Sequence, residues 1–450
     1  MVIVVLGGGG VRTPILIRGL LRRLKTYRVE EVRLLDVDAR RLTLIGRVVS
    51  EQLRRAGNPF RLVFTEDARE GLRGADVVIS AIRVGGDAAR IVDEVVPLRY
   101  DVLGQETTGP GGFAMAMRTI PVLLEYARLL EEVAPHCWFI NFTNPSGLIT
   151  QALTAHSKVR VVGICDGPGA LARALTAALN ISATEVYVDY FGLNHLGWVK
   201  GLYWQGRDLL PEVLEHFDLA IRDPVLKRFG GAVVQALGVV PQEYLYYYYF
   251  AREAVANIKA TGHTRGEFVR NLNDRLWERL DAAGSDGARA VSVYEEYITA
   301  RHGSYMQVEA GLPGHEERFH LDSAEESGYE AVALSVLDGL FGDRPTRVIV
   351  NVPNRGAIGE LDDEDVVEVP CAVSSEGIRP YAVGPVPESV RGLMITVKTY
   401  ERATIAAAIL KSYALALRAL IVHPLVPSVA IAQRILDDYR REHGQWLQLS

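Results

Sequence analysis

The fold of this 450-residue chain is decided by the stretch Val2-Ile3-Val4-Val5-Leu6-Gly7-Gly8-Gly9-Gly10. Its apolar, mostly β-branched half is typical of a buried strand, and its glycines are typical of a tight turn. Residues 13–25 then show the apolar and basic spacing of a helix. Strand, glycine turn and helix in this order predict the first unit of a doubly wound parallel sheet.

The same alternation continues along the chain. We expect an α/β protein whose residues 1–190 form a Rossmann-type nucleotide-binding domain. Residues 191–450 are richer in helical patterns and predict a mixed, helix-rich α+β domain. Further strands are expected at 31–38, 62–65, 75–81, 137–141, 159–164, 348–352 and 366–373. Helices are expected up to residue 56, from Pro145, and over 224–236, 264–283, 330–341 and 402–422.

The composition limits the function classes. Lys and Arg number 49 against 55 Asp and Glu, a net charge of −6 that does not indicate a nucleic-acid-binding surface. The cysteines, Cys137, Cys165 and Cys371, are too few for a disulfide framework and indicate a reducing compartment. No run reaches the roughly 20 apolar residues that a bilayer requires, and 402–422 carries Lys411 and Arg418 within it. We therefore expect a cytoplasmic protein that binds neither nucleic acid nor membrane.

The glycine turn is a candidate cofactor site. Its glycines, Gly7, Gly8, Gly9 and Gly10, would let the backbone approach a diphosphate at the start of a helix. The usual third glycine is missing, so a purely structural turn is the alternative. Asp36 ends the second predicted strand 26 residues after Gly10 and could accept hydrogen bonds from an adenosine ribose. Residues 1–190 are therefore expected to bind NAD rather than NADP.

Polar residues follow other predicted strands. The glycine-rich segment 104–113 is expected to line a site, although a surface loop is the alternative. Asn141 and Asn144 follow a strand and should face the crevice at the carboxyl edge of the sheet. The alternative for Asn144 is that it caps the helix that begins near Pro145.

Cys165 and His195 are candidate metal ligands. Cys165 follows the strand 159–164, and Asn194-His195 follows the alternating segment 186–192. A thiolate and an imidazole at two neighbouring strand ends could hold a divalent metal and leave positions open for substrate oxygens. The alternative is a plain core cysteine and a structural histidine, which are the commoner cases.

A tyrosine-rich segment spans residues 241–250. Several phenols in one helical segment must face different sides, so some belong to the core and others to a cleft. A phenol acts as a general base only when its pKa is lowered, for example by a nearby cation.

These stretches together resemble the NAD- and metal-dependent family 4 glycoside hydrolases, most closely their 6-phospho-β-glucosidase branch. The resemblance runs from the first strand almost to the C-terminus. The matching stretches are 7–14, 83–86 with Arg90, 104–113, 118–121, 141–147, 165–168, 192–195, 354–358, 383–384 with 391–393, 400–402 and 423–428.

The resemblance implies a glycosidase that works by transient oxidation. NAD would oxidise the sugar at C3, a metal such as Mn²⁺ would assist removal of the C2 proton, and elimination would expel the C1 substituent. It implies that Cys165 and His195 bind the metal and that Tyr244 is the base, with Tyr247 as the alternative. It also implies roles for Arg83 at the cofactor and for Arg90, Asn144, Asn194, Arg265 and Arg301 at the substrate. Homodimers or homotetramers are expected, because relatives often form them.

Two departures leave the substrate open. Asp166 stands where the β-glucosidase branch tends to have Asn, a feature of branches acting on α-glycosides, and could be a general acid or a metal ligand. Gln307 and Pro353 replace a serine and an arginine that could receive a 6-phosphate. Arg301, Arg265 or Arg355 could compensate; otherwise the sugar is unphosphorylated.

Two other functions are weighed against the glycosidase. One is an NAD-dependent dehydrogenase of small hydroxy acids that uses His195 as proton carrier. The other is a non-catalytic NAD-binding regulatory module. Net accumulation of NADH with substrate would indicate the dehydrogenase, because the glycosidase returns its hydride.

Overall fold

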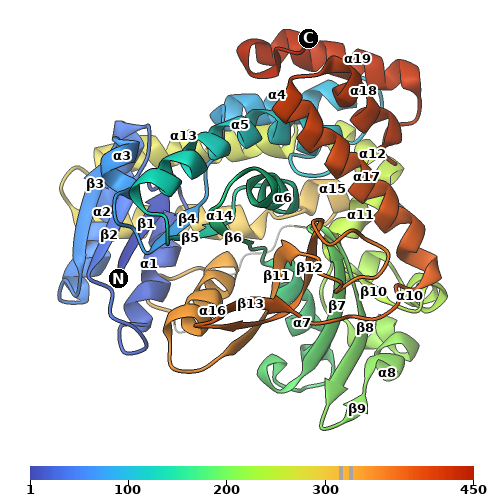
Figure 1. Cartoon of the computed structure of the whole chain (residues 1–450), viewed down its shortest axis with the longest axis horizontal. Helices are drawn as coiled ribbons and strands as arrows, with labels where there is room; N and C mark the ends of the chain where they lie inside the picture. Colours follow the sequence, from blue (N-terminus) through green and yellow to red (C-terminus); the bar gives the residue numbers. More distant parts are fainter. Residues whose placement is uncertain (314–317, 324–327) are drawn as a thin grey trace.

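The computed structural model describes residues 1–313, 318–323 and 328–450. Within them, a nine-stranded sheet runs in the order β13-β12-β11-β6-β5-β4-β1-β2-β3 (Figure 1). The strands β1 to β6 are parallel, and their order is that of a Rossmann fold. The expected doubly wound α/β fold is therefore confirmed. Their bounds are β1 Val2–Leu6, β2 Glu31–Leu35, β3 Arg61–Thr65, β4 Val77–Ser80, β5 Trp138–Asn141 and β6 Arg160–Gly163.

Helices follow each of these strands along the chain. They are α1 Thr13–Arg22, α2 Ala39–Arg55, α3 Ala68–Leu72, α4 Gly86–Leu98, α5 Pro110–Val133, α6 Ser146–His156 and α7 Gly167–Ala178. The second strand is shorter than expected, because the Asp38 side chain accepts a hydrogen bond from Arg41 N and caps α2. Residues 110–113, expected in a loop, form the first turn of α5, where Pro110 is favourable.

Three later strands extend the same sheet. β11 Thr346–Pro353, β12 Val366–Ser374 and β13 Gly377–Pro380 run antiparallel to their neighbours, and Asn351 of β11 pairs with Gly163 of β6. The sheet is therefore mixed and draws strands from both sides of residue 190. The division into two domains at that residue remains a prediction.

A smaller antiparallel sheet carries one end of the candidate site. It contains β7 Tyr187–Leu193, β8 Leu196–Trp204 and β10 Val240–Pro241, and β9 Arg207–Asp208 pairs with β8. The 3₁₀ turn η3 Glu243–Leu245 and helix α11 Tyr246–Tyr249 follow β10 directly. The tyrosine run is thus divided between two short helical elements. The small sheet lies to the lower right of the C-terminal strands in Figure 1.

The remaining helices differ from the expected ones at two places. They are η1 Ala183–Glu185, α8 Leu210–Glu215, α9 Phe217–Ala220, η2 Leu226–Arg228, α10 Gly231–Leu237, α12 Ala251–Thr261, α13 Arg265–Ala282, α14 Gly287–Gly303, α15 Gln307–Ala310, α16 Tyr329–Phe341, α17 Glu388–Leu410, α18 Tyr413–Val422, α19 Val429–His443 and η4 Gly444–Leu447. The single helix expected over 224–236 is wrong, because Gly230, with φ 74°, separates η2 from α10. The single helix expected over 402–422 is also wrong, because Lys411 adopts φ 51° and Ser412 caps α18.

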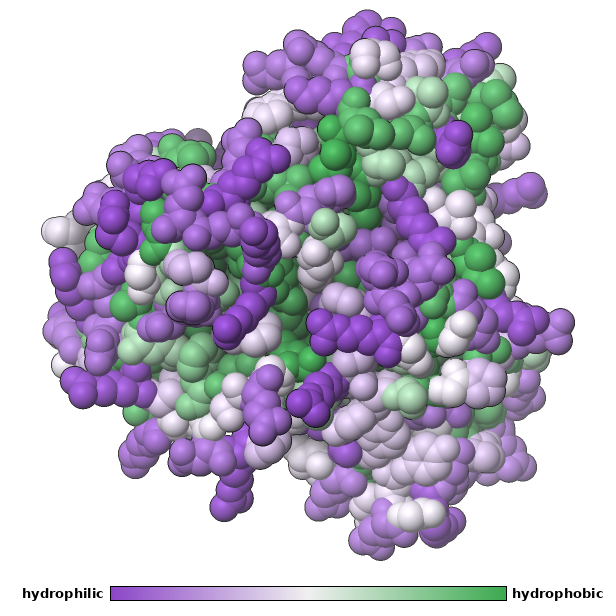
Figure 2. Space-filling view, in the orientation of Figure 1, coloured by the Kyte–Doolittle hydropathy of each residue, from purple (hydrophilic) through white to green (hydrophobic). Residues whose placement is uncertain are grey.

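The C-terminal helices lie over α4 and α5 (Figure 1). Figure 2 shows apolar surface gathered where α17 and α18 lie. Exposed apolar side chains on these helices are Ile395, Leu410 and Ile421. In the described parts of the chain, every helix is too short or too polar to cross a membrane.

Candidate active site

The glycine turn connects β1 to α1 and closes onto β2. Gly7 has φ 92°, and the N–H groups of Gly7 and Gly8 both donate to Leu35 O, at 2.9 and 3.0 Å. A Cβ on Gly8 would lie 2.6 Å from Leu34 Cβ, so no larger residue fits there. The glycines are thus required by the close packing of the turn, whatever ligand it holds.

Asp36 lies directly over this turn. Its Oδ2 accepts a hydrogen bond from Gly9 N at 2.9 Å, and its Oδ1 accepts one from Asp38 N at 3.1 Å. Burial raises the pKa of Asp36, and the two backbone N–H groups oppose that shift. The structure therefore brings together the two features that the sequence assigned to one cofactor site; their role in binding NAD remains a prediction.

Cys165 and Asp166 stand between the end of β6 and the start of α7. Cys165 is buried, and its Sγ lies 4.0 Å from Asp166 Oδ1. Burial raises the pKa of the Cys165 thiol, and the charges of Glu368 and Asp166 raise it further. Asp166 is the N-cap residue of α7, yet its side chain caps no backbone N–H. The carboxyl is therefore available for another interaction.

His195 occupies the two-residue turn between β7 and β8. Its ring stacks on Tyr244, with centroids 3.8 Å apart and planes at 8°. Burial lowers the pKa of His195 to about 4, so the imidazole is neutral near pH 7. Its Nδ1 is buried and lacks a hydrogen-bond partner among the described residues. A neutral ring with an unused nitrogen is the state in which histidine binds a cation.

Tyr244 and Tyr247 differ in their surroundings. Tyr244 lies in η3 against His195, whereas Tyr247 is buried and meets the ring of Tyr244 at 68°. Burial raises the pKa of Tyr244; charges at Glu106, Cys165 and Asp166 add to this, and a hydrogen bond from Tyr305 opposes it. Of the two phenols, Tyr244 is therefore the one that stacks on His195 and lies within electrostatic reach of Cys165.

Arg83 and Arg90 converge on Glu106, which the sequence reasoning missed. Glu106 Oε2 lies 2.5 Å from Arg83 and 3.3 Å from Arg90, and Arg90 Nε also donates to Glu94 at 2.7 Å. Although burial opposes ionisation, the two arginines lower the pKa of Glu106 to about 2. A charged residue inside the glycine-rich segment 104–113 was the signal that could have found it.

Arg265 and Arg301 form a second group of arginines. Arg265 donates to Ser304 Oγ at 2.7 Å and to Arg301 O at 3.0 Å, and Arg301 donates to Tyr297 OH at 2.7 Å. In the part of the chain that the structure describes, neither guanidinium pairs with a carboxylate. Their positive charges are thus available to an anionic ligand.

Arg355 does not join this group. It follows β11, which runs antiparallel to β6, and it lines a pocket with Arg160 at the start of β6. Cys165 lies beyond the other end of the same strand. Of the three arginines considered for a phosphate, only Arg265 and Arg301 lie together.

The asparagines are held differently from the expectation. Asn141 is fully buried, and its Nδ2 donates to Thr143 O and Ser146 O, so the expectation that it faces the crevice is wrong. The capping alternative for Asn144 is also wrong, because α6 has Pro145 as N-cap residue and no side-chain cap.

Both ends of the Asn194 side chain are engaged within the fold. Its Oδ1 accepts from Gly147 N at 3.3 Å, and its Nδ2 donates to Glu368 Oε1 at 3.2 Å. The substrate roles of Asn144 and Asn194 remain predictions.

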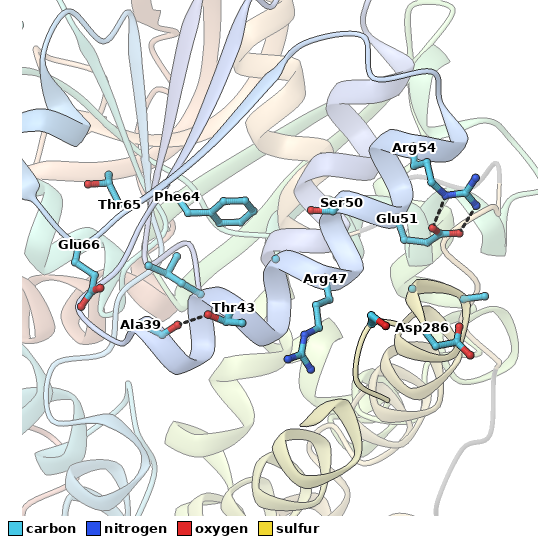
Figure 3. A pocket seen from close by; sticks show the side chains of 15 residues that line it. Ala39, Thr43, Arg47, Ser50, Glu51, Arg54, Phe64, Thr65, Glu66 and Asp286 are labelled. Atoms are coloured by element: carbon cyan, nitrogen blue, oxygen red, sulfur yellow. Dashed lines mark hydrogen bonds and ion pairs between the residues drawn. The ribbon is translucent and has the colours of Figure 1, made fainter. Parts of the chain in front are cut away.

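A separate pocket of about 1160 Å³ lies between α2, the end of β3 and the start of α14 (Figure 3). Arg47 and Arg54 of α2, Phe64 of β3 and Asp286 line it. None of the predicted site residues borders it, so its size does not make it the active site.

Comparison with known proteins covers both halves of the chain. A model of the family 4 glycosyl hydrolases matches residues 2–181, and a model of the C-terminal domain of that family matches 190–426. A probable 6-phospho-β-glucosidase of Bacillus subtilis (strain 168) is 33% identical over 460 residues, covering 99% of this chain and 97% of the relative.

Solved structures agree with these matches. The 6-phospho-β-glucosidase of Thermotoga maritima with manganese, NAD⁺ and glucose-6-phosphate has a TM-score of 0.84 and 28% identity, and 100% of each chain is covered. A 6-phospho-α-glucosidase from gut microorganisms, with NAD and glucose-6-phosphate, also has a TM-score of 0.84, with 27% identity over 100% of this chain and 99% of the other.

These matches confirm the resemblance drawn from the sequence and the expected glycoside hydrolase activity. They do not favour a hydroxy-acid dehydrogenase or a non-catalytic module. The chain therefore belongs to the family 4 glycosyl hydrolases.

Proposed function

We propose that this glycosidase hydrolyses glucosides that carry a 6-phosphate, with NAD and a divalent cation such as Mn²⁺ as cofactors. The observation that carries the proposal is the stack of His195 on Tyr244, within electrostatic reach of Cys165 and Asp166. The names of the related enzymes, and the NAD, manganese and glucose-6-phosphate in solved relatives, support the same chemistry.

The chemistry of Cys165 and His195 fits a cation. The unpartnered Nδ1 of His195 offers a lone pair, and the suppressed ionisation of Cys165 would be relieved by a positive charge. No group of three or more His, Cys, Asp or Glu side chains is placed to hold a metal in the ranges that the structure describes. Two protein ligands leave coordination positions open for substrate oxygens, as a catalytic site requires.

The reaction divides between the cofactors and the side chains. When bound, NAD⁺ takes a hydride from the sugar C3 and later returns it, while the cation polarises the neighbouring oxygens and acidifies the C2 proton. Tyr244, as the phenolate that a nearby cation would favour, accepts the C2 proton, and the carboxyl of Asp166 donates a proton to the leaving oxygen at C1. Water then adds at C1 and a proton returns to C2, which completes the hydrolysis. The glycine turn and Asp36 hold the cofactor diphosphate and ribose. Arg83 borders the cofactor, and Arg90, Asn144 and Asn194 surround the sugar.

Arg265 and Arg301 are proposed to bind the 6-phosphate. Arg265 is held against Ser304 and the backbone oxygen of Arg301, and in the described ranges neither guanidinium has a carboxylate partner, so the two offer charge and N–H donors. This pair would replace the serine and arginine whose positions are taken by Gln307 and Pro353.

Paired substrates test the proposal. The protein with NAD⁺, Mn²⁺ and reductant is given aryl α- and β-glucosides, with and without 6-phosphate, in D₂O. We expect cleavage of the phosphorylated β-glucoside, deuterium at C2 of the released sugar, and no net NADH. Cleavage of the α-anomer instead would assign Asp166 to the α-specific reaction. Indifference to the phosphate would contradict the role of Arg265 and Arg301, and cleavage without C2 exchange would contradict the mechanism.

We also propose that the protein is a cytoplasmic homodimer or homotetramer. The exposed apolar side chains Ile395, Leu410 and Ile421 on α17 and α18 support self-association. Light scattering of the protein and of a Leu410→Glu variant tests this: a monomeric wild-type protein would contradict it.

A further inference from the structure

A buried carboxyl, that of Glu368, is hydrogen-bonded to the turn that carries His195. Glu368 of β12 is fully buried and lies far along the chain from the other site residues. Its Oε2 accepts from Tyr190 OH at 2.7 Å, and its Oε1 accepts from Asn351 Nδ2 at 2.9 Å and Asn194 Nδ2 at 3.2 Å. Both carboxyl oxygens are thus satisfied, each by neutral donors, as a buried carboxyl requires.

The three donors belong to three different elements. Asn351 lies on β11 directly opposite Glu368, Tyr190 lies on β7, and Asn194 lies in the turn between β7 and β8. The carboxyl therefore joins the large sheet to the small sheet. Because Asn194 Oδ1 also accepts from Gly147 N at the start of α6, the turn is held from two sides.

This turn needs such support. Leu193 pairs with Leu196, so only Asn194 and His195 form the turn, and His195 has φ 61°. A histidine in the left-handed region is disfavoured, and such a conformation persists only when its surroundings enforce it. The side chain of Asn194, one residue away, holds the turn in place through its hydrogen bonds to Glu368 of β12 and to Gly147 at the start of α6.

Glu368 also acts on the other proposed ligand. Burial raises the pKa of the Cys165 thiol, and the nearby charge of Glu368 raises it further. One carboxyl is therefore hydrogen-bonded to the turn that carries His195 and lies within electrostatic reach of Cys165.

We propose that Glu368 is a positioning residue for the cation site: through Asn194 it fixes the Asn194–His195 turn and so the place of the imidazole relative to Cys165. This inference rests on the proposed function, in which Cys165 and His195 bind the cation. Among the residues that the structure describes, the hydrogen bonds of Glu368 go to Tyr190, Asn194 and Asn351 and not to His195 or Cys165. Groups that orient metal ligands from behind affect metal affinity by about 10- to 100-fold when they are removed.

The test measures Mn²⁺ affinity by electron paramagnetic resonance on the NAD-bound protein without substrate. Glu368→Gln keeps the shape but faces the Asn194 amide with a group that is partly a donor, and we expect Mn²⁺ to bind about 10- to 100-fold more weakly. Asn194→Ala, at a less buried position, breaks the same link and should match it. Tyr190→Phe removes a donor that does not belong to the turn, and it serves as the matched control with a smaller loss.

The outcomes distinguish a failure of the proposed cation site from a failure of the positioning role of Glu368 alone. If Cys165→Ser and His195→Ala do not weaken Mn²⁺ binding, the proposed cation site itself is wrong. If they abolish binding while Glu368→Gln and Asn194→Ala bind Mn²⁺ as the wild type does, only the positioning role is overturned. NAD affinity and thermal unfolding, measured on each variant, show whether the fold is intact; should Glu368→Gln not fold, Asn194→Ala decides the question alone.

Discussion

The glycine turn and the His195–Tyr244 region are two polar regions of opposite character. At the turn, backbone N–H groups and Asp36 satisfy one another, and the packing is complete as it stands. At His195, a buried nitrogen has no partner among the described residues, and burial suppresses ionisation of Cys165 and Tyr244. In the first region the hydrogen bonds between the backbone and Asp36 are already made. In the second region a bound cation would use that nitrogen of His195 and favour the ionised forms of Cys165 and Tyr244.

The largest effect is expected from removing the cation ligands. Cys165→Ser and His195→Ala should each reduce turnover by about a thousandfold or more, because the cation is needed to make the C2 proton acidic. Binding of Mn²⁺ should release about one proton from Cys165 near pH 8, since a thiol must ionise to bind a metal. Proton release is followed with an indicator dye, and turnover with the aryl phosphoglucoside.

Cys137→Ser is the matched control, because this thiol is also buried and its pKa is raised to about 12, yet it lies at the start of β5. Equal losses of turnover in the Cys137 and Cys165 variants would mean that both thiols only pack in the core. That result would contradict the proposed difference between the two regions.

The next effect concerns the base. Tyr244→Phe removes only the hydroxyl, so kcat should fall by about 10²- to 10⁴-fold while the affinity for NAD is unchanged. Steady-state kinetics and NAD titration measure the two quantities. Tyr247→Phe is the control, since that phenol is buried behind Tyr244. A larger kcat loss in the Tyr247 variant would reverse the assignment of the two tyrosines.

The parallel strands and the glycine turn could be predicted from sequence because their signals are local. A β-branched run followed by glycines is informative within ten residues, and Asp36 lies at a fixed spacing from it. Pairing of β11 with β6 joins residues far apart in the chain, and no local pattern specifies such a partner. The break at Lys411 was missed because the apolar pattern continues across it, although Ser412, a residue type that favours helix N-caps, was a local signal for a new helix.

The function of the His195–Tyr244 region could not be predicted from local sequence patterns alone. Spacing alone left Cys165 and His195 as core residues or ligands, and only the combined family motifs favoured the metal. Glu106 and Glu368 were missed because their partners come from other elements. A charged residue in the apolar run of β12 was nevertheless a usable signal, since a carboxyl in a buried strand must find hydrogen-bond donors.

One added methyl group at Gly8 should disrupt the close packing of the glycine turn. Gly8→Ala would place Cβ 2.6 Å from Leu34 Cβ, which should cost about 1–3 kcal/mol of stability and weaken NAD binding about tenfold or more. Mn²⁺ affinity should change little if the regions are independent. Urea unfolding and NAD titration measure the effect. Gly359→Ala is the control, because a Cβ there meets no atom within 4 Å; an equal effect in both variants would contradict the close packing of the turn.

The smallest effect comes from a buried imidazole outside the site. His423 is 1% exposed, and burial lowers its pKa to about 3. In the unfolded chain its pKa is about 6.5, so between pH 6.5 and 3 the unfolded state binds one more proton and stability falls as pH falls. This residue should contribute a loss of about 1.4 kcal/mol per pH unit below 6.5. In His423→Asn, the free energy of unfolding, measured by urea titration between pH 7 and 5, should depend less steeply on pH by that amount.

Saturating Mn²⁺ should leave the contribution of His423 unchanged, because its ring packs between Tyr248 and Tyr400, outside the proposed cation site. At the proposed cation site, Mn²⁺ would hold Cys165 as a thiolate in the folded protein, whereas the unfolded chain keeps this thiol protonated below about pH 8.5, so the same addition should steepen the pH dependence of stability. The regions around His195 and His423 would then respond to Mn²⁺ in different ways. If Mn²⁺ alters the pH dependence of wild type and of a His195→Ala variant alike, the cation acts elsewhere, and an unpartnered nitrogen is no guide to the site.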